Sequence, residues 1–170
     1  VVGGEMRGIS GVTISGSFVR SVQNEYEVCF KCHGDNTDRV ESKITRVITQ
    51  TNTRIEFDPA NPSYHPIAAP GVNEDVPSLT EPRSVTSIIY CTYCHNSDDN
   101  LGVEGPHGST YAPILRANYD TDDFTKESEV AYALCYKCHR RNSILDDESF
   151  PKHSIHLEND IPCSACHDAH

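Results

Sequence analysis

The sequence predicts a loop-rich chain with short helices, a few short strands and an interior filled by bound groups. Three observations lead to this prediction. Apolar residues make up only about 37% of the chain, counting Gly but not Tyr, against the 45–50% of globular domains. The pentad C-x-x-C-H occurs four times and takes up all eight cysteines. That is one pentad per roughly 42 residues, which leaves little chain for long elements.

Each pentad brings two thiols and one imidazole together within five residues. The pentads are CFKCH (29–33), CTYCH (91–95), CYKCH (135–139) and CSACH (163–167). Two cysteines at this spacing reach the two vinyl groups along one edge of a haem, and the adjacent histidine then lies beneath the iron. The sequence therefore predicts four covalently attached haem c groups, stacked as the core. The thioether cysteines are Cys29, Cys32, Cys91, Cys94, Cys135, Cys138, Cys163 and Cys166, and the proximal ligands are His33, His95, His139 and His167.

Eight cysteines also admit other interpretations. In a secreted chain they suggest a disulfide framework, and paired C-x-x-C units can bind zinc or iron–sulfur clusters. None of these sites requires a histidine directly after every second cysteine, so covalent haem is favoured. Because thioether attachment takes place outside the cytoplasm, we expect an exported chain whose signal peptide has been removed.

The remaining histidines match the need for distal ligands. Five are left after the pentads: His65, His107, His153, His156 and His170. They suffice to make every haem bis-histidine with one histidine to spare, whereas the only methionine is Met6. We therefore expect low-potential, six-coordinate haems. A filled sixth position leaves no place for a substrate, which favours an electron carrier over an enzyme.

The sequence around each distal candidate differs. His65 lies between prolines in NPSYHPI, and His107 lies in the glycine turn GPHGS. His153 and His156 form an H-x-x-H pair one helical turn apart. His170 ends the sequence, three residues after a proximal histidine. Which of the five serves which iron, and which is spare, stays open at this stage.

The N-terminal third is predicted to contain strands and one helix. Residues 6–22 are rich in glycine and β-branched residues and are expected to form short strands within an N-terminal arm over 1–23. Residues 25–33 are expected to form a short helix capped near Asn24. Residues 43–57 alternate loosely and predict another strand.

The remaining chain is predicted to be mostly loop. Residues 58–82 are proline-rich and are expected to form an ordered, irregular loop, and residues 84–90 a strand that leads into the second pentad. The acidic run 119–129 is expected to be a solvated loop. The stretch 131–139 repeats the pattern of 25–33 and predicts a helix capped near Ser128. The spacing between first cysteines falls from 62 to 44 to 28 residues, so the third and fourth haems are expected to be neighbours.

The charge balance and hydropathy exclude two classes of partner. The net charge of −11 leaves no basic patch for nucleic acid and disfavours an anionic membrane surface. No apolar run approaches the ~18 residues that a membrane-spanning helix needs. We predict a single domain over residues 1–170 with no membrane span.

Several stretches of the sequence resemble a known family, the outer-surface tetrahaem c-type cytochromes of metal-respiring bacteria, of the outer-membrane cytochrome E type. The similar stretches are NPSYHPI, SIIYCTYCHNSDD, GPHGS, ALCYKCHRRNSILDDESF and CSACHDAH. The resemblance covers about Cys29 to His170. It implies a continuous chain of bis-histidine haems, polymerisation into extracellular nanowires, and one distal histidine donated by the neighbouring subunit.

Three functions fit these observations. The first is a homopolymeric filament subunit that conducts electrons from the cell surface to an extracellular acceptor or another redox protein. The second is a soluble periplasmic or surface tetrahaem shuttle, whose acidic surface steers a basic partner. The third is a multihaem reductase, which needs an open iron and is the least favoured because the supply of distal histidines is ample.

Overall fold

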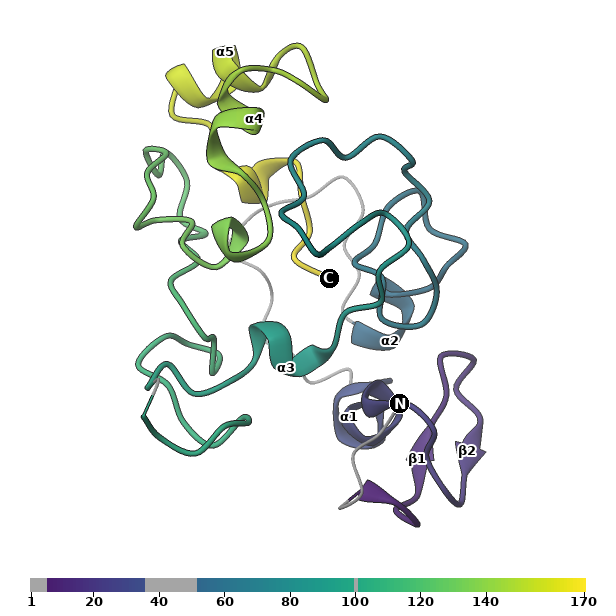
Figure 1. The fold of residues 1–170 in the computed structure, drawn as a ribbon. Coiled ribbons are helices and arrows are strands. Elements are labelled where there is room, and N and C mark those ends of the chain that lie inside the picture. Colours follow the sequence, from purple (N-terminus) through teal and green to yellow (C-terminus); the bar gives the residue numbers. More distant parts are fainter. Residues whose placement is uncertain (1–5, 36–51, 100) are drawn as a thin grey trace. The chain divides into compact units, whose positions relative to one another are not determined.

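The computed structural model of the chain describes residues 6–35, 52–99 and 101–170. Figure 1 shows short helices and one two-stranded ladder joined by long irregular connections in this described part. The fold class predicted from the sequence is confirmed. The elements are β1 (Gly11–Val12), β2 (Phe18–Val19), α1 (Glu25–His33), α2 (Thr53–Glu56), α3 (Cys91–Cys94), η2 (Cys135–Lys137), α4 (Arg141–Leu145), α5 (His153–Glu158) and η3 (Cys163–Ala165).

The chain divides into two compact units. The first unit comprises Val1–Val72, Ser87–Cys91 and Ala169–His170, and the second comprises Asn73–Thr86 and Thr92–Asp168. Each is described by itself below, and the single domain over 1–170 stays a prediction. Within the described ranges, no helix has the length and apolar character needed to cross a membrane.

The N-terminal arm of the first unit forms a hairpin, which contains short strands as the sequence predicts for residues 6–22. Strands β1 and β2 are antiparallel and pair Gly11 with Val19 and Val12 with Phe18. The turn between them contains Gly16 at φ 81°, a left-handed conformation that glycine adopts without steric cost. The side chain of Phe18 remains 65% exposed, so the hairpin keeps one apolar side chain in solvent.

Helix α1 begins where the sequence predicts, directly after Asn24. The Glu27 carboxylate oxygen Oε2 accepts hydrogen bonds from the backbone N–H groups of Gln23, at 2.6 Å, and Asn24, at 3.0 Å. These donors have no partner within the helix, so the carboxylate satisfies them. Glu27 is itself buried. The expected start of this helix is therefore confirmed.

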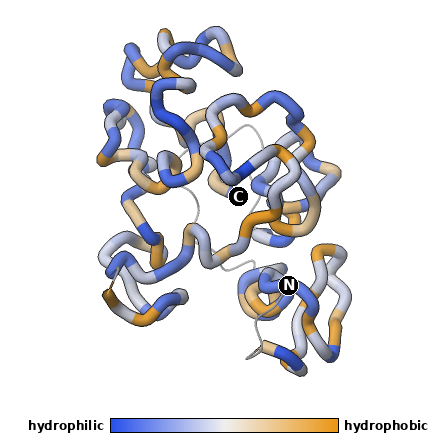
Figure 2. The backbone as a smooth tube through the Cα atoms, viewed as in Figure 1, coloured by the Kyte–Doolittle hydropathy of each residue, from blue (hydrophilic) through white to orange (hydrophobic). Residues whose placement is uncertain are grey.

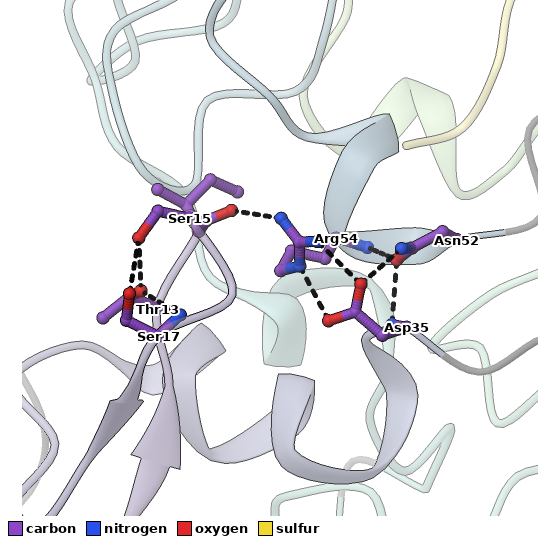
Figure 3. A network of polar contacts seen from close by, with 7 residues as sticks. Thr13, Ser15, Ser17, Asp35, Asn52 and Arg54 are labelled. Carbon is purple, nitrogen blue, oxygen red and sulfur yellow. Dashed lines mark hydrogen bonds and ion pairs between the residues drawn. The ribbon is translucent and has the colours of Figure 1, made fainter.

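A polar network ties the end of α1 to the hairpin and to α2 (Figure 3). The Arg54 guanidinium donates to both carboxylate oxygens of Asp35 at 2.9 and 2.6 Å and to the Ile14 carbonyl at 2.8 Å. Asn52 accepts from the Asp35 backbone N–H and donates to its carboxylate. Asp35, just after α1, is thereby joined to the cap of α2 and to its second residue, Arg54.

The apolar core of the first unit is small. Tyr26 and Phe30 of α1 pack with Phe57 and Ile67, and Cys91 packs against this cluster. Ring centroids lie 5.3 Å apart for Tyr26–Phe30 and 6.3 Å apart for Phe30–Phe57. Figure 2 shows hydrophobic and hydrophilic residues interleaved along the chain, with no long apolar segment. A core this thin agrees with an interior completed by bound groups.

Two strand predictions were wrong. Residues 53–56 form α2 because the Asn52 side chain accepts from the Arg54 N–H and the Asn52 carbonyl accepts from two following N–H groups. The rest of that predicted strand, 43–51, lies outside the described residues. Residues 84–90 form turns and extended backbone without a ladder. Their backbone bond runs from the Ile89 N–H to the Pro66 carbonyl, and a proline-rich partner lacks the N–H groups a ladder needs.

The helix predicted over 131–139 is also wrong, although Ser128 accepts from the Ala131 N–H as a cap would. The Ala131 carbonyl accepts from the Asp120 N–H, and the Leu134 N–H donates to the Asn118 carbonyl, both at 2.9 Å. These bonds interrupt the i to i−4 ladder of an α-helix, of which separate bonds remain from the Tyr136 N–H to the Tyr132 carbonyl and from the His139 N–H to the Cys135 carbonyl. Only the 3₁₀ turn η2 remains.

The two predicted loops are observed. Residues 58–82 contain no helix or strand, and the Tyr64 hydroxyl closes a turn on the Pro70 carbonyl. The acidic run 119–129 is irregular, but one of its members is not merely solvated. Glu127 is 8% exposed and receives two hydrogen bonds from the Arg141 guanidinium and one from the Tyr136 hydroxyl.

Candidate haem-binding sites

All four pentads fold as a single helical turn. The cysteines of the first pentad lie on α1, α3 spans Cys91–Cys94, and η2 and η3 begin at Cys135 and Cys163. In the last two, the histidine N–H donates to the carbonyl of the first cysteine, at 3.0 Å for His139 and 2.9 Å for His167. One turn places the two cysteines, three positions apart, on the same face, with the histidine directly beside the second cysteine. This is the arrangement that attachment along one haem edge requires.

None of the eight cysteines, all of which lie in the described ranges, forms a disulfide. Six are partly buried, and Cys32 and Cys166 are exposed. A chain folded around a disulfide framework would bring them together in bridges, so this observation does not favour the disulfide interpretation.

Two proximal candidates are oriented by hydrogen bonds from segments distant in sequence. Nδ1 of His139 lies 2.9 Å from the buried Ser78 hydroxyl, and Nδ1 of His95 lies 3.1 Å from the Pro113 carbonyl oxygen. The Pro113 carbonyl can only accept, so this bond places a proton on Nδ1 of His95 and leaves Nε2 to coordinate a metal. The Ser78 hydroxyl can donate or accept, and its bond orients the His139 ring. These second partners are the groups that commonly orient metal-binding histidines.

The structure brings His153 of α5 to His167, the proximal candidate of the fourth pentad. The two ring centroids lie 6.2 Å apart at an interplanar angle of 40°. Imidazoles on opposite sides of one metal ion, each about 2.0 Å from it, place their centroids about 6.3 Å apart. Burial lowers the pKa of His153, which favours the neutral form that a metal ligand needs. Its buried Nδ1 has no hydrogen-bond partner in the part of the chain that the structure describes.

His170 is held by groups of the first unit. Its Nδ1 lies 2.7 Å from the buried Glu56 carboxylate, and its carbonyl accepts from the His65 N–H at 2.8 Å. The Phe57 ring packs against its imidazole with centroids 5.2 Å apart. The structure therefore brings two distal candidates together at their backbones, next to the core of the first unit.

The other two distal candidates lie in separate surroundings. Nδ1 of His156 lies 2.6 Å from the Lys152 carbonyl oxygen, and its ring stacks on Phe150. His107 is exposed in a turn in which its N–H donates to the Gly105 carbonyl. Proximal candidate His33 is likewise exposed, at the end of α1.

Neighbouring pentads approach one another through their thiols. In the first unit, a hydrogen bond with the Cys91 thiol lowers the pKa of Cys29. In the second unit, burial and then the nearby Cys163 thiol raise the pKa of Cys135 to about 12. Burial and then the Cys138 thiol raise the pKa of Cys94 to about 11. The expected nearness of the third and fourth pentads agrees with the Cys135–Cys163 interaction.

The donor set fits covalent haem. Each pentad presents two unbridged thiols and a histidine on one turn, and the His153–His167 spacing suits a metal between the rings.

Sequence reasoning did not identify the groups that hold the histidines. Ser78 and Pro113 lie 61 and 18 residues from their imidazoles, and Glu56 lies 114 residues from His170. Serine, proline and glutamate carry no local signal for such a role. The partners become visible only when the chain folds.

Comparison with known proteins assigns the chain to a family. The profile of the outer membrane cytochrome MtrC/MtrF-like family, domains II/IV, matches residues 15–170. Searches among curated proteins and among solved structures returned no match. The match spans all four pentads and every distal candidate. With its thiol and histidine geometry, the chain belongs to the MtrC/MtrF-like outer membrane cytochromes, cell-surface multihaem proteins that transfer electrons extracellularly through covalently bound c-type haems.

Proposed function

We propose that this chain carries electrons through four bis-histidine c-type haems as one subunit of an extracellular filament. The observation that carries the bis-histidine part is the pairing of His153 with His167 at the spacing of two trans axial ligands. A distal histidine on each iron leaves no open position, so the chain acts as an electron carrier and not as an enzyme.

Haem iron, when bound, supplies a one-electron couple that changes oxidation state without changing its ligands. The chain's residues provide the rest. The pentad thiols fix position by covalent bonds, which suits a protein working outside the cell. The hydrogen bonds between Ser78 and His139 and between Pro113 and His95 hold the ligand rings in one orientation. Rigid ligands favour electron transfer because little rearrangement accompanies the change of charge.

The neighbouring thiols suggest the order of transfer. Cys29 meets Cys91, Cys94 is close to Cys138, and Cys135 is close to Cys163. Within the second unit, the attachment sites of the second, third and fourth pentads therefore follow one another as in the sequence. We propose transfer among these haems in the order second, third and fourth.

The filament assembly rests on the resemblance to the cytochrome E type and on the N-terminal arm. Phe18 on β2 and Leu101 and Val103 near His107 expose 65, 97 and 71% of their surfaces. A second copy of the chain that packed against these side chains would remove their apolar surface from water. The expected partner is a second copy of the chain, with one distal histidine donated across the interface.

Cryo-electron microscopy of the purified holoprotein tests the assembly. Ordered thin filaments, with haem density continuous between subunits, would support the proposal and identify the shared histidine. Monodisperse particles of one chain's mass across salt and pH would instead favour the soluble tetrahaem shuttle. Electron paramagnetic resonance separately tests ligation, because a high-spin haem with an open position would favour a reductase.

A further inference from the structure

Glu56 belongs neither to a pentad nor to the expected set of haem ligands. It ends α2, and only 4% of its side chain is exposed. Removing a carboxylate from water is unfavourable unless a donor compensates for the lost hydration. Here the donor is the imidazole of His170, with Nδ1 and Oε2 2.7 Å apart.

The position of Glu56 is fixed by its surroundings. The Asn52 side chain caps α2, and Arg54 in the same turn is bound to Asp35 and to the Ile14 carbonyl. On the other side, the Phe57 ring packs against the His170 imidazole. The carboxylate therefore meets an imidazole that has little freedom to rotate, which is what an orienting group requires.

The charge of this partner distinguishes His170 from other candidate ligands. The Nδ1 atoms of His139 and His95 lie near neutral groups, the Ser78 hydroxyl and the Pro113 carbonyl. A carboxylate draws the Nδ1 proton more strongly than either, so it makes the opposite nitrogen a stronger donor to a metal. A stronger axial donor favours ferric over ferrous iron and so lowers the reduction potential.

We propose that Glu56 is a positioning residue for a haem ligand: its carboxylate orients His170 toward iron and lowers the reduction potential of the haem that His170 serves. The proposal rests on the proposed function, in which His170 is an axial ligand. The axial histidines would then differ in donor strength along the haem chain, because a charged partner acts on one of them and neutral partners act on others.

The test uses the four-haem holoprotein and the substitution Glu56→Gln, which keeps size and an acceptor oxygen but removes the charge. We expect one of the four midpoint potentials to move upward in a spectroelectrochemical titration while the other three stay in place. The low-field resonance of one low-spin haem should shift in the paramagnetic resonance spectrum. Glu74→Gln, which removes the same charge from an exposed loop position, is the matched control and should leave both spectra unchanged.

A purely structural ion pair would give a different result. Glu56→Gln would then lower the unfolding midpoint but leave the four potentials and resonances of the parent, and that outcome overturns the proposal. An equal shift in Glu74→Gln overturns it too, because the effect would be one of net charge. If Glu56→Gln does not load four haems, Glu56→Asp decides. The shorter aspartate side chain moves the carboxylate away from His170. An upward shift of one midpoint potential therefore supports the proposal, and unchanged potentials refute it.

Failure of the proposed function is recognised separately. His170→Ala should convert one low-spin haem to another coordination state if His170 is an axial ligand. An unchanged spectrum would show that it is no ligand, which removes the basis of the inference. A changed spectrum together with an unaltered Glu56→Gln titration rejects the role of Glu56 alone.

Discussion

The imidazole of His153 lies 6.2 Å from that of His167 between ring centroids, so under the proposed ligation a substitution at His153 acts on one haem. We expect His153→Met to raise the midpoint potential of that haem, because a thioether ligand favours ferrous iron more than imidazole does. A redox titration followed by visible absorption measures this. Ile155→Met on the same helix, at a side chain 52% exposed, is the control. Four potentials identical to those of the parent would show that His153 is not a ligand.

Asp35 makes the stability of the first unit depend on pH in the acid range. Hydrogen bonds from the Arg54 guanidinium, followed by those from Asn52, lower the pKa of Asp35 from 3.8 to about 2. A carboxyl whose folded pKa is depressed stabilises the fold above its ordinary pKa, and this contribution is lost as pH falls toward the folded value. We expect the free energy of unfolding of the holoprotein to decrease between pH about 4 and about 2.

The variant Asp35→Asn isolates this effect. It should be less stable than the parent at pH 6, with the difference shrinking as the pH approaches about 2. Denaturant unfolding at a series of pH values measures the difference. A gap between parent and variant that stays constant with pH would mean that the Arg54–Asp35 pair does not control stability.

Among the elements, α1 depends on one buried carboxylate. Glu27→Ala would leave the N–H groups of Gln23 and Asn24 without their acceptor, at a cost of about 1–3 kcal/mol. Glu27→Gln keeps an acceptor oxygen at the same position and should lose less stability. Chemical unfolding of the two holoprotein variants compares them, and equal losses would assign the effect to charge instead of capping.

The elements also show how far sequence reasoning extends. The short strands within 6–22 and the start of α1 after Asn24 were predictable because their signals are local: glycines among β-branched residues, and an asparagine directly before a helical pattern. The pairing of the strands into a hairpin and the role of Glu27 were not predicted. The helix expected over 131–139 failed because Asp120 and Asn118 take the bonds that a helix would use. No local pattern reveals that competition.

The same division holds for the candidate sites. The cysteines and proximal histidines follow from the pentads, since attachment chemistry fixes their spacing within five residues. The pairing of His153 with His167 and the contact of His170 with Glu56 depend on tertiary approach. The sequence supplied the distal candidates, but their partners required the fold.

At the scale of the whole molecule, few hydrophobic side chains are buried in the ranges that the structure describes. The buried hydrophobic residues of the described part are Val22, Tyr26, Phe30, Phe57, Ile67, Leu115, Ala131 and Tyr132. So small a set cannot offset the conformational entropy lost by a chain of this length. The haems must therefore supply much of the burial that stabilises the native state.

We expect the chain to be unfolded when haem attachment is prevented. Replacing all eight pentad cysteines by serine should give a far-ultraviolet circular dichroism spectrum of a disordered chain and rapid proteolysis. A variant lacking only Cys163 and Cys166 is the comparison, and it should lose one haem while retaining protection elsewhere. A cooperative unfolding transition in the haem-free chain would contradict this expectation.

The hydrogen-bond partners of His95 and His139 differ in their order along the chain relative to the pentads. Ser78, which bonds His139, precedes it by 61 residues, whereas Pro113, which bonds His95, follows it by 18. As the chain emerges from the ribosome N-terminus first, the residue that will hold His139 already exists when its pentad appears. The residue that will hold His95 is made later. In the order of synthesis, His139 thus follows its hydrogen-bond partner, whereas His95 precedes its own partner.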